Sequence, residues 1–342
     1  MEKKHKIIIT AVSLILIVII GTTIPLILNS LLTSGIITFN TQKLGEIYTG
    51  GGAVDVEVHG DIAYVVDITD NNPGGLVIIN VSDPTHPYKL GSYYQSGLPR
   101  SVDVVGEIAY LANSQLGLEI LNISDLSNPT KIDQYTGSGN AYDIQVIGDI
   151  AYLADWSIGL IILNVSDPSN VSEITHFGTL GACIHLTVVD HLAYIIDHLT
   201  LSSGLKIINV SNPANPFQVG NHAPSGVDYW NPYVYGDYVY ICNHASGGGE
   251  LRILNATDPS HIVRIGTFDE ESSIFSSYVD GTKAYLADYQ TGLLVVNVSN
   301  PSNPGKIAQF FDGGHSIDVE VIDNIAYVAD WDDGLEIIKI IV

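Results

Sequence analysis

Short apolar runs separated by turn residues recur along almost the whole chain. Four successive runs, 54–58 (VDVEV), 62–67 (IAYVVD), 75–81 (GLVIINV) and 88–94 (YKLGSYY), are rich in Val, Ile and Tyr, and Gly, Asp-Pro or Asn-Pro lie between such runs. No helical periodicity of three to four residues follows the first 28 residues. This pattern predicts short β-strands joined by tight turns.

The third run of each group is apolar at nearly every position, which predicts a strand buried on both faces. A single four-stranded sheet cannot bury both of its faces by itself. Several such sheets stacked face to face can do so, and the pattern therefore favours an architecture built from stacked sheets.

The motif Gly-x-Ile-Ala-Tyr recurs seven times in strict or degenerate form, and its tyrosines are separated by 46, 42, 42, 46, 45 and 42 residues. The tyrosines are Tyr64, Tyr110, Tyr152, Tyr194, Tyr240, Tyr285 and Tyr327. A repeat of about 40–50 residues with four strands is typical of a propeller blade. We therefore predict an all-β fold, a seven-bladed β-propeller over residues 43–342.

The two ends of the repeat region predict how the ring closes. The segment 43–50 (KLGEIYTG) matches a fourth strand but precedes the first complete unit, and the chain stops at GLEIIKIIV, directly after a third strand. If residues 43–50 form the outer strand of the seventh blade, the first and last strands share one sheet. The ring is then closed, whereas an open solenoid would need capping repeats.

One segment carries a resemblance to a known family. Residues 151–170 (AYLADWSIGLIILNVSDPSN) resemble the LVIVD repeat, and related segments cover residues 43–342. The resemblance implies a β-propeller at the cell surface of a bacterium or archaeon. It implies no defined reaction, so no catalytic residues follow from it. The chain departs from the repeat by using Asn where the name of the repeat has Asp.

A basic cluster, MEKKHK, and about 22 mostly apolar residues from Ile7 to Leu28 precede the repeats. The apolar stretch is long enough to cross a membrane, and the lysines before it predict a cytoplasmic amino terminus. We expect residues 1–28 to be a cytoplasmic tip and a transmembrane helix that acts as a signal anchor, residues 29–42 to be a tether, and the propeller to be extracellular. A cleaved signal peptide is the alternative, although its apolar region is usually shorter.

Acidic residues outnumber basic ones by 37 to 13, which gives a formal net charge of −24. Such a surface repels nucleic acid and anionic headgroups but tolerates cationic ligands and divalent metals. Cys183 and Cys242 are too few for a disulfide framework or a zinc site built from cysteines. We expect two small buried thiols, with a single bridge as the alternative.

Asn-x-Ser/Thr sequons recur where the chain leaves the third strand. The candidate N-glycosylation sites are Asn80, Asn122, Asn164, Asn209, Asn255 and Asn297, with an additional one at Asn170. Asn and Ser also suit a junction between a strand and a turn. The repeat itself therefore accounts for six of the seven sites, whether or not they carry glycans.

The first strand of every blade lines the central channel of a propeller. Five positions before the tyrosine motif begins, these strands carry a ring of polar residues: Asp55, Asp143, His185, Asn231, Ser276 and Asp318. The second unit is two residues shorter, so either Ser101 or Asp103 takes this place. The ring is a candidate site for a cation, and a water-filled channel without a ligand is the alternative.

A second set of polar residues ends the second strands: Asp67, Asn113, Asp155, Asp197, Asn243, Asp288 and Asp330. Asp or Asn before a turn is most simply explained by an Asx turn. The segments 67–75 and 330–334 are acidic enough to suggest calcium, but neither has the ligand spacing of a calcium loop.

Loops that join strand four to strand one, and strand two to strand three, share the face at the channel mouth. Strand order places histidines and tryptophans there: Trp156, His185, His198, His222, Trp230, His244 and Trp331. A transition metal bound by His185, His198 or His244 is one interpretation, although paired-ligand spacing is absent. A binding surface for a carbohydrate, peptide or protein is the other. The candidate ligand-binding residues are Trp156, His185, His198, Trp230, His244 and Trp331.

The chain has no Gly-x-Ser-x-Gly elbow and no phosphate-binding loop with its lysine. We therefore interpret it as a membrane-anchored extracellular β-propeller that acts as a binding, recognition or scaffold module of the cell surface. Its expected partners are the membrane and a surface protein or carbohydrate, not nucleic acid. A divalent cation, calcium or a transition metal, is the candidate cofactor. The alternatives are a metal-dependent hydrolase or lyase with its site at the channel mouth, and a passive envelope component with no specific ligand.

Overall fold

The computed structural model describes residues 40–68, 74–94, 97–137, 139–198, 204–224, 228–245, 248–270 and 272–342. Within these residues, no helix is long and apolar enough to cross a membrane. The predicted anchor and the tether up to residue 39 lie outside the described residues.

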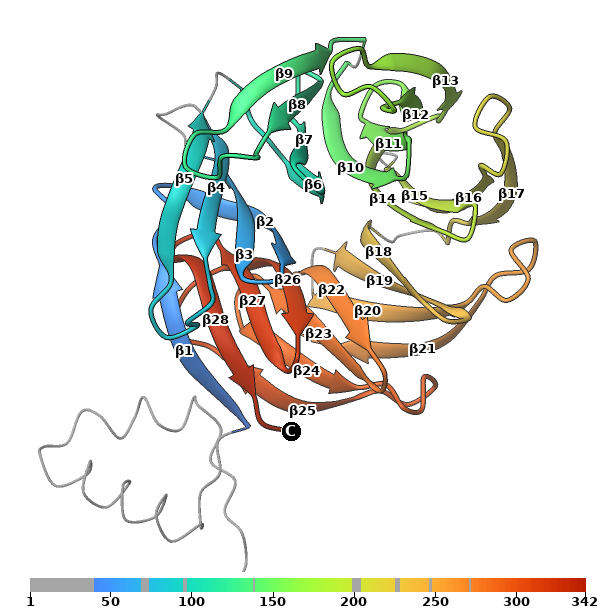
Figure 1. The fold of residues 1–342 in the computed structure, drawn as a ribbon. Coiled ribbons are helices and arrows are strands. Elements are labelled where there is room, and N and C mark those ends of the chain that lie inside the picture. Colours follow the sequence, from blue (N-terminus) through green and yellow to red (C-terminus); the bar gives the residue numbers. More distant parts are fainter. Residues whose placement is uncertain are drawn as a thin grey trace, which may run out of the picture.

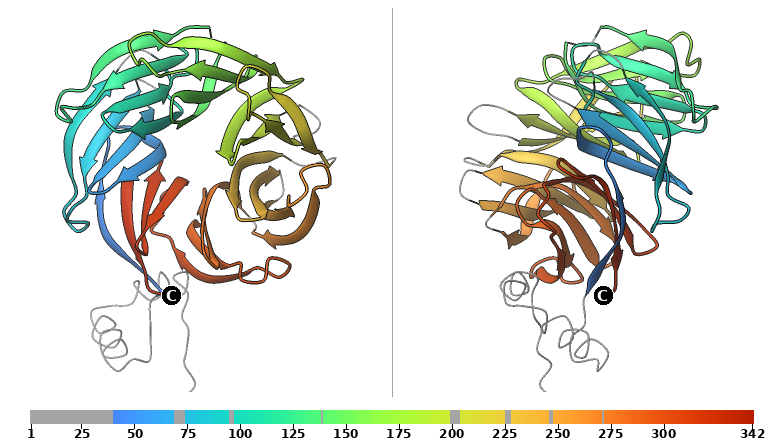
Figure 2. Two further views of the ribbon diagram at one scale, coloured as in Figure 1. Left: turned by 45° about the vertical axis from the view of Figure 1, so that its right-hand side comes forward. Right: turned by 90° about the vertical axis from the view of Figure 1, so that its left-hand side faces the viewer.

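Seven four-stranded antiparallel sheets are arranged as blades in a ring around a central channel (Figures 1 and 2). The first three blades are β2 (Gly52–His59), β3 (Ile62–Ile68), β4 (Gly75–Asn80) and β5 (Tyr88–Tyr94); β6 (Ser101–Val105), β7 (Ile108–Ala112), β8 (Leu118–Asn122) and β9 (Thr130–Tyr135); and β10 (Ala141–Ile147), β11 (Ile150–Asp155), β12 (Gly159–Asn164) and β13 (Ser172–Gly178).

The remaining four blades continue in chain order. They are β14 (Ala182–Val189), β15 (Leu192–His198), β16 (Gly204–Asn209) and β17 (Phe217–His222); β18 (Tyr229–Tyr235), β19 (Tyr238–Ala245), β20 (Gly248–Asn255) and β21 (Val263–Asp269); β22 (Ile274–Asp280), β23 (Lys283–Asp288), β24 (Gly292–Asn297) and β25 (Gly305–Phe310); and β26 (Ser316–Ile322), β27 (Ile325–Asp330) and β28 (Gly334–Ile340) with β1 (Thr41–Ile47).

The third strand of each blade is buried on both faces, as its sequence predicts. In β4, Leu76 and Ile78 join the core shared with the second blade, where Leu111 lies, whereas Val77 packs into the core shared with the seventh blade, beside Ile337. Alternate residues of one strand therefore serve two different interfaces. Burial between neighbouring sheets is the main apolar contribution to stability.

The turn that follows the third strand packs against the outer strand of the preceding blade. At Gly91 of β5, a Cβ atom would collide with the carbonyl oxygen of Leu126 in the next blade. At Gly266 of β21, it would collide with the carbonyl oxygen of Pro301. These glycines are thus required by close contact between blades and not by backbone conformation.

The ring closes between the two ends of the chain. β1 pairs antiparallel with β28, with Thr41 opposite Ile340 and Ile47 opposite Leu335. Figure 1 shows β1 in blue beside β28 in red, at the outer edge of the last blade. The predicted seven-bladed propeller closed by an N-terminal strand is confirmed. The strand begins two residues earlier than expected, so Thr41 and Gln42 belong to the fold and not to the tether.

An ionic cluster fastens the closing strand. Lys43 Nζ donates to Asp312 Oδ2 at 2.6 Å and to Glu336 Oε1 at 2.7 Å, and it also pairs with Glu46. Burial alone would lower the pKa of Lys43, but the hydrogen bonds to these carboxylates raise it above its usual range. Burial and a hydrogen bond with Asp312 raise the pKa of Glu336 to about 8. The ammonium group thus compensates acidic groups that the seam of the ring buries.

Replacing Lys43 with Ala should lower the free energy of unfolding by about 2 kcal/mol, because Glu336 stays buried without its cation. Chemical denaturation of the full chain measures this change. Lys339→Ala removes an exposed lysine of the same sheet and should cost less than about 0.5 kcal/mol. Equal effects of the two substitutions would contradict a role of the cluster in closure.

Candidate functional site

The innermost strands of six blades are irregular where they reach the channel mouth. β2, β10, β14, β18, β22 and β26 each shift register against their neighbour there, for example between Ala53 and Asp55 in β2. An extra residue in such a bulge lets two consecutive side chains face the same side. In β2 these are Val54 and Asp55, and both line the mouth.

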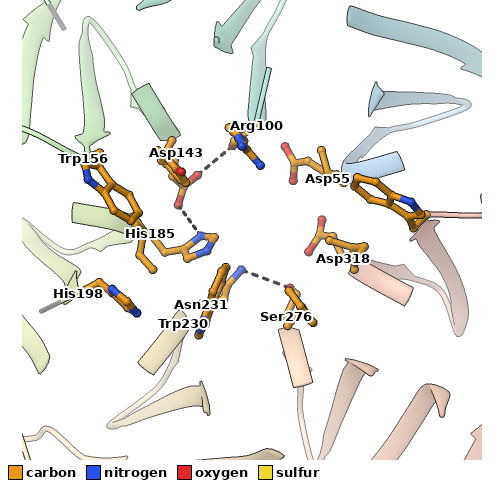
Figure 3. A pocket seen from close by; sticks show the side chains of 17 residues that line it. Asp55, Arg100, Asp143, Trp156, His185, His198, Trp230, Asn231, Ser276 and Asp318 are labelled. Atoms are coloured by element: carbon orange, nitrogen blue, oxygen red, sulfur yellow. Dashed lines mark hydrogen bonds and ion pairs between the residues drawn. The ribbon is translucent and has the colours of Figure 1, made fainter. Parts of the chain in front are cut away.

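Residues from all seven blades enclose a cavity of about 420 Å³ at the channel mouth (Figure 3). The whole predicted polar ring lines it, and Ser101 takes the ring position in the second blade. Five of the six candidate ligand-binding residues also line it: Trp156, His185, His198, Trp230 and Trp331. The side chain of His244 lies outside the described part of the structure. A cavity of this size is in the range of small-molecule sites.

Arg100, Tyr142 and Phe275 also line the cavity, although the sequence analysis did not single them out. Each directly precedes a ring position. Strict alternation along a strand would turn such a residue away from the channel, and in β10 and β22 the bulge turns it back. The signal in the sequence was an apolar or aromatic residue before the ring position in six units.

The carboxylates of the ring connect neighbouring blades. Each accepts a hydrogen bond from a backbone N–H of the next innermost strand, at the residue after the ring position. The pairs are Asp318 with Val56 at 3.1 Å, Asp55 with Val102 at 2.7 Å and Asp143 with Leu186 at 2.8 Å. The acidic residues therefore have a structural role, whatever ligand the cavity accepts.

A second layer repeats this pattern two residues deeper in the channel. The pairs are Glu320 with Val58, Glu57 with Val104, Asp103 with Val146 and Gln145 with Val188. Asp103, one of the two candidates for the ring position of the second blade, belongs to this deeper layer. The channel thus contains two tiers of side chains that accept hydrogen bonds across blade boundaries.

Because these carboxyl groups are buried close together, their pKa values are raised. Burial, with the nearby charges of Asp103 and Glu320, raises the pKa of Glu57 to about 9. Burial also raises the pKa of Glu320 to about 7 and that of Asp103 to about 6. At the mouth, burial and the adjacent carboxylates of Asp318 and Asp143 raise the pKa of Asp55 well above its usual range. The channel therefore retains protons at neutral pH.

An arc of aromatic rings borders the cavity. Ring centroids lie 5.3 Å apart between Tyr142 and Trp156, and 5.4 Å apart between Trp230 and Phe275. His198 lies between the two pairs, at 6.3 Å from Trp156 and 6.5 Å from Trp230. These are the separations of interacting aromatic pairs, so the arc is a continuous aromatic wall.

The histidines of the mouth are paired with carboxylates. His185 Nδ1 lies 3.7 Å from Asp143 Oδ2, and His198 Nε2 lies 2.6 Å from Asp228 Oδ1. His222, also expected at this face, stacks on Tyr229 and does not line the cavity.

These imidazoles do not converge on a metal centre. In the described part of the chain, only Glu46, Asp312 and Glu336 bring three potential ligand atoms within 4.8 Å of one another. That cluster lies at the seam and contains Lys43 Nζ. Within the described residues, therefore, the cavity has no set of three donors for a transition metal.

Three of the seven polar residues that end the second strands, Asp155, Asp288 and Asp330, form the predicted Asx turns. Asp155 Oδ1 accepts the N–H groups of Ser157 and Ile158, both at 2.8 Å. Asp288 and Asp330 accept equivalent bonds from the two residues that follow at the same spacing. These carboxylates fix the loops that carry Trp156 and Trp331. Asp197 and Asn243 instead accept N–H groups from the segment before their own blade, those of Gly181 and Asp228, both at 2.8 Å.

The sequon asparagines at the third strands also form Asx turns. In each, Oδ1 accepts the N–H of the Ser or Thr two residues later, at 2.9–3.1 Å. The residues are Asn80, Asn122, Asn164, Asn209, Asn255 and Asn297. The additional sequon residue, Asn170, is exposed.

Both cysteines are free and buried. Burial raises the pKa of the Cys242 thiol to about 12 and that of Cys183 well above its usual range. A nucleophilic cysteine needs the opposite shift, so both residues act as small core side chains.

The blades and the cavity together define a seven-bladed β-propeller with a site of ligand size at the mouth of its channel. The LVIVD repeat matches seven segments, residues 50–95, 96–137, 138–179, 185–223, 230–270, 278–310 and 313–340. The chain belongs to the LVIVD repeat family, which confirms the resemblance found in the sequence. No curated protein matches the chain.

Solved structures show similarity of fold. A crystal structure of a protein from Lactobacillus plantarum has 17% sequence identity and a TM-score of 0.66, with 76% of this chain and 86% of that chain covered. The computationally designed Ika8 protein has 8% identity and a TM-score of 0.60, with 86% and 99% covered. At such low identity, these similarities concern the fold alone.

The raised pKa values predict how stability depends on pH. A carboxyl group whose pKa is higher in the folded state binds protons more tightly there, so stability falls as pH rises from about 4.5 through the folded-state pKa. For Asp103, Glu320 and Glu57 this window extends to about 6, 7 and 9. Thermal unfolding should therefore give a higher Tm at pH 5 than at pH 8.

Glu320→Gln keeps an acceptor for the Val58 N–H and removes the charge. We expect it to stabilise the chain by roughly 1–2 kcal/mol at pH 8 and to have little effect at pH 5. Glu107→Gln, at an exposed turn, is the control with the same change of charge. A Tm that rises steadily from pH 5 to pH 8 would show that the channel acids do not destabilise the fold as they lose their protons.

Proposed function

We propose that this chain is a ligand-binding β-propeller that is anchored in the membrane and acts as a recognition or scaffold module at the cell surface. The observation that supports the proposal is the cavity at the channel mouth, with its carboxyl groups and its aromatic wall. Concave sites with an apolar lining and a few polar groups are where propellers and other folds bind small ligands.

Blade packing accounts for the acids of the channel but not for the tryptophans of its mouth. The chain has three tryptophans, and all three line the cavity. Trp156 leaves 43% of its surface exposed, although burying this ring would be favourable. Exposed indole rings around a polar site are typical of recognition surfaces.

The arrangement supports binding over the alternative of a metal-dependent hydrolase or lyase. His185 and His198 are each paired with a carboxylate, and Trp230 lies against both imidazoles, with centroid distances of 5.7 and 6.5 Å. Two imidazoles that each contact an indole ring and a carboxylate suit the wall of a pocket better than a coordination sphere.

Binding at the cavity is tested by a thermal-shift screen of soluble glycans, peptides and small organic ions against the full chain in detergent. A true ligand should raise the Tm of the wild type and lose most of this effect in Trp156→Ala, because the ring forms part of the aromatic wall. Leu180→Ala is the control, since Leu180 is 87% exposed and does not line the cavity. Ligands that stabilise all three proteins equally would place the binding site elsewhere.

Membrane anchoring at the cell surface is tested on cells that express the full chain. Because residues 7–28 are apolar and follow lysines, the chain should stay in the membrane fraction after alkaline carbonate extraction, and external protease should remove the propeller. A variant that lacks residues 1–28 should lose membrane association. Release of the wild type by carbonate, or its full protection from protease in intact cells, would contradict the proposal.

A further inference from the structure

Two carboxyl groups of the cavity lie opposite two of its three tryptophans. Figure 3 shows Asp55 and Asp318 close together on one side and Trp156 and Trp230 on the other. Asp143 lies near Trp156, and Trp331 packs at Gly52 of β2, the strand that carries Asp55. Asp55 and Asp318 each use Oδ2 to accept a backbone N–H, which fixes both carboxyl groups at the wall. A group bound in the cavity would therefore lie between this carboxyl pair and the indole rings of Trp156 and Trp230.

The protein itself already places a cation on this aromatic wall. The guanidinium carbon of Arg100 lies 5.2 Å from the centroid of the Tyr142 ring, within the range of cation–π interactions. Arg100 is the only lysine or arginine among the described residues that line the cavity. One cation against three lining aspartates, Asp55, Asp143 and Asp318, leaves the site with an excess of acidic groups.

On the basis of the function proposed above, we propose that the ligand of this cavity carries an organic cation, an alkylated or quaternary ammonium group, bound between the rings of Trp156 and Trp230 and the Asp55–Asp318 carboxyl pair.

Other classes of ligand fit the lining less well. A metal ion needs several donor atoms with lone pairs. Ring carbons are not such donors, and they make up most of the aromatic wall, which consists of Tyr142, Trp156, Trp230 and Phe275. A phosphate or another anion would meet the carboxyl groups of Asp55 and Asp318. An alkylammonium group can bind the aromatic rings and the carboxylates together, because its positive surface interacts favourably with both.

The proton bound by the acidic pair makes the affinity for such a ligand depend on pH. The burial of Asp55 and the neighbouring Asp318 raise the pKa of Asp55, so the pair retains a proton when the cavity is empty. The other titratable or charged groups that line the cavity or lie just below it are Asp143, Arg100, His185, His198, Glu57, Asp103 and Glu320. A bound cation replaces this proton, which passes to the solvent, so affinity should rise with pH.

The test uses choline and its uncharged isostere 3,3-dimethyl-1-butanol as probes, with the full chain in a non-ionic detergent. Because all three tryptophans line the cavity, intrinsic tryptophan fluorescence reports on this site directly. We expect a saturable change with choline and at least about tenfold weaker binding of the isostere. Choline affinity should increase between pH 5 and pH 8.

Asp318→Asn removes one charge of the pair and keeps an acceptor for the Val56 N–H. It should weaken choline binding about tenfold and reduce its dependence on pH. Asp323→Asn is the matched control, because it makes the same change of charge in an exposed turn of the same blade, beyond the far end of β26. Denaturation curves verify that both variants are folded.

The outcomes separate this inference from the function on which it rests. Equal binding of the two probes, lost in Trp156→Ala, would leave a binding cavity but overturn the charge of its ligand. No fluorescence change with choline up to tens of millimolar would overturn the inference as well, while the thermal-shift screen still decides whether the cavity binds another ligand.

Discussion

The structure depends on how the innermost strands satisfy their backbone where two blades meet. In the described residues, sheet ladders run only within a blade, and a single isolated bridge, Ser114–Ala141, joins strands of neighbouring blades. The innermost strands would therefore present unpaired N–H groups to the channel. At the four boundaries from the seventh blade round to the fourth, carboxyl and amide side chains of the preceding blade accept such bonds, as Asp55 does for Val102 and Asp103 does for Val146. This arrangement places many acids in a narrow space, and it raises the pKa values of Glu57, Glu320 and Asp103.

The fold and the site therefore have a common origin. The acids needed to join the blades also line the cavity, and their mutual repulsion makes positive charge favourable there. Lys43 illustrates the same principle at the seam of the ring, where its ammonium group lies among Glu46, Asp312 and Glu336. At the seam the protein supplies the cation from its own chain. At the mouth Arg100 supplies only one, and the remaining acidic character is open to a ligand.

The fold could be predicted almost completely from the sequence because its main signals are periodic. The recurring tyrosine motif and the doubly buried third strands follow from local pattern, and the register of the ring placed Asp55 and Asp318 at the mouth. The contribution of Arg100, Tyr142 and Phe275 depends on the local backbone at the channel mouth, which a binary pattern does not reveal. The pairing of His198 with Asp228 was equally hidden, because the two residues come from different blades, β15 and the start of the fifth.

Closure by β1 also determines the order in which the molecule can be completed. Synthesis produces β1 first, whereas β28, with which it pairs, is produced last. During translation, β1 therefore remains with an unpaired edge while about 290 residues are synthesised between the two strands. Its sequence, TQKLGEI, contains charged and small residues and few large apolar ones. Such a composition limits association with other nascent chains, so the strand that completes the ring is also suited to a long delay before it folds.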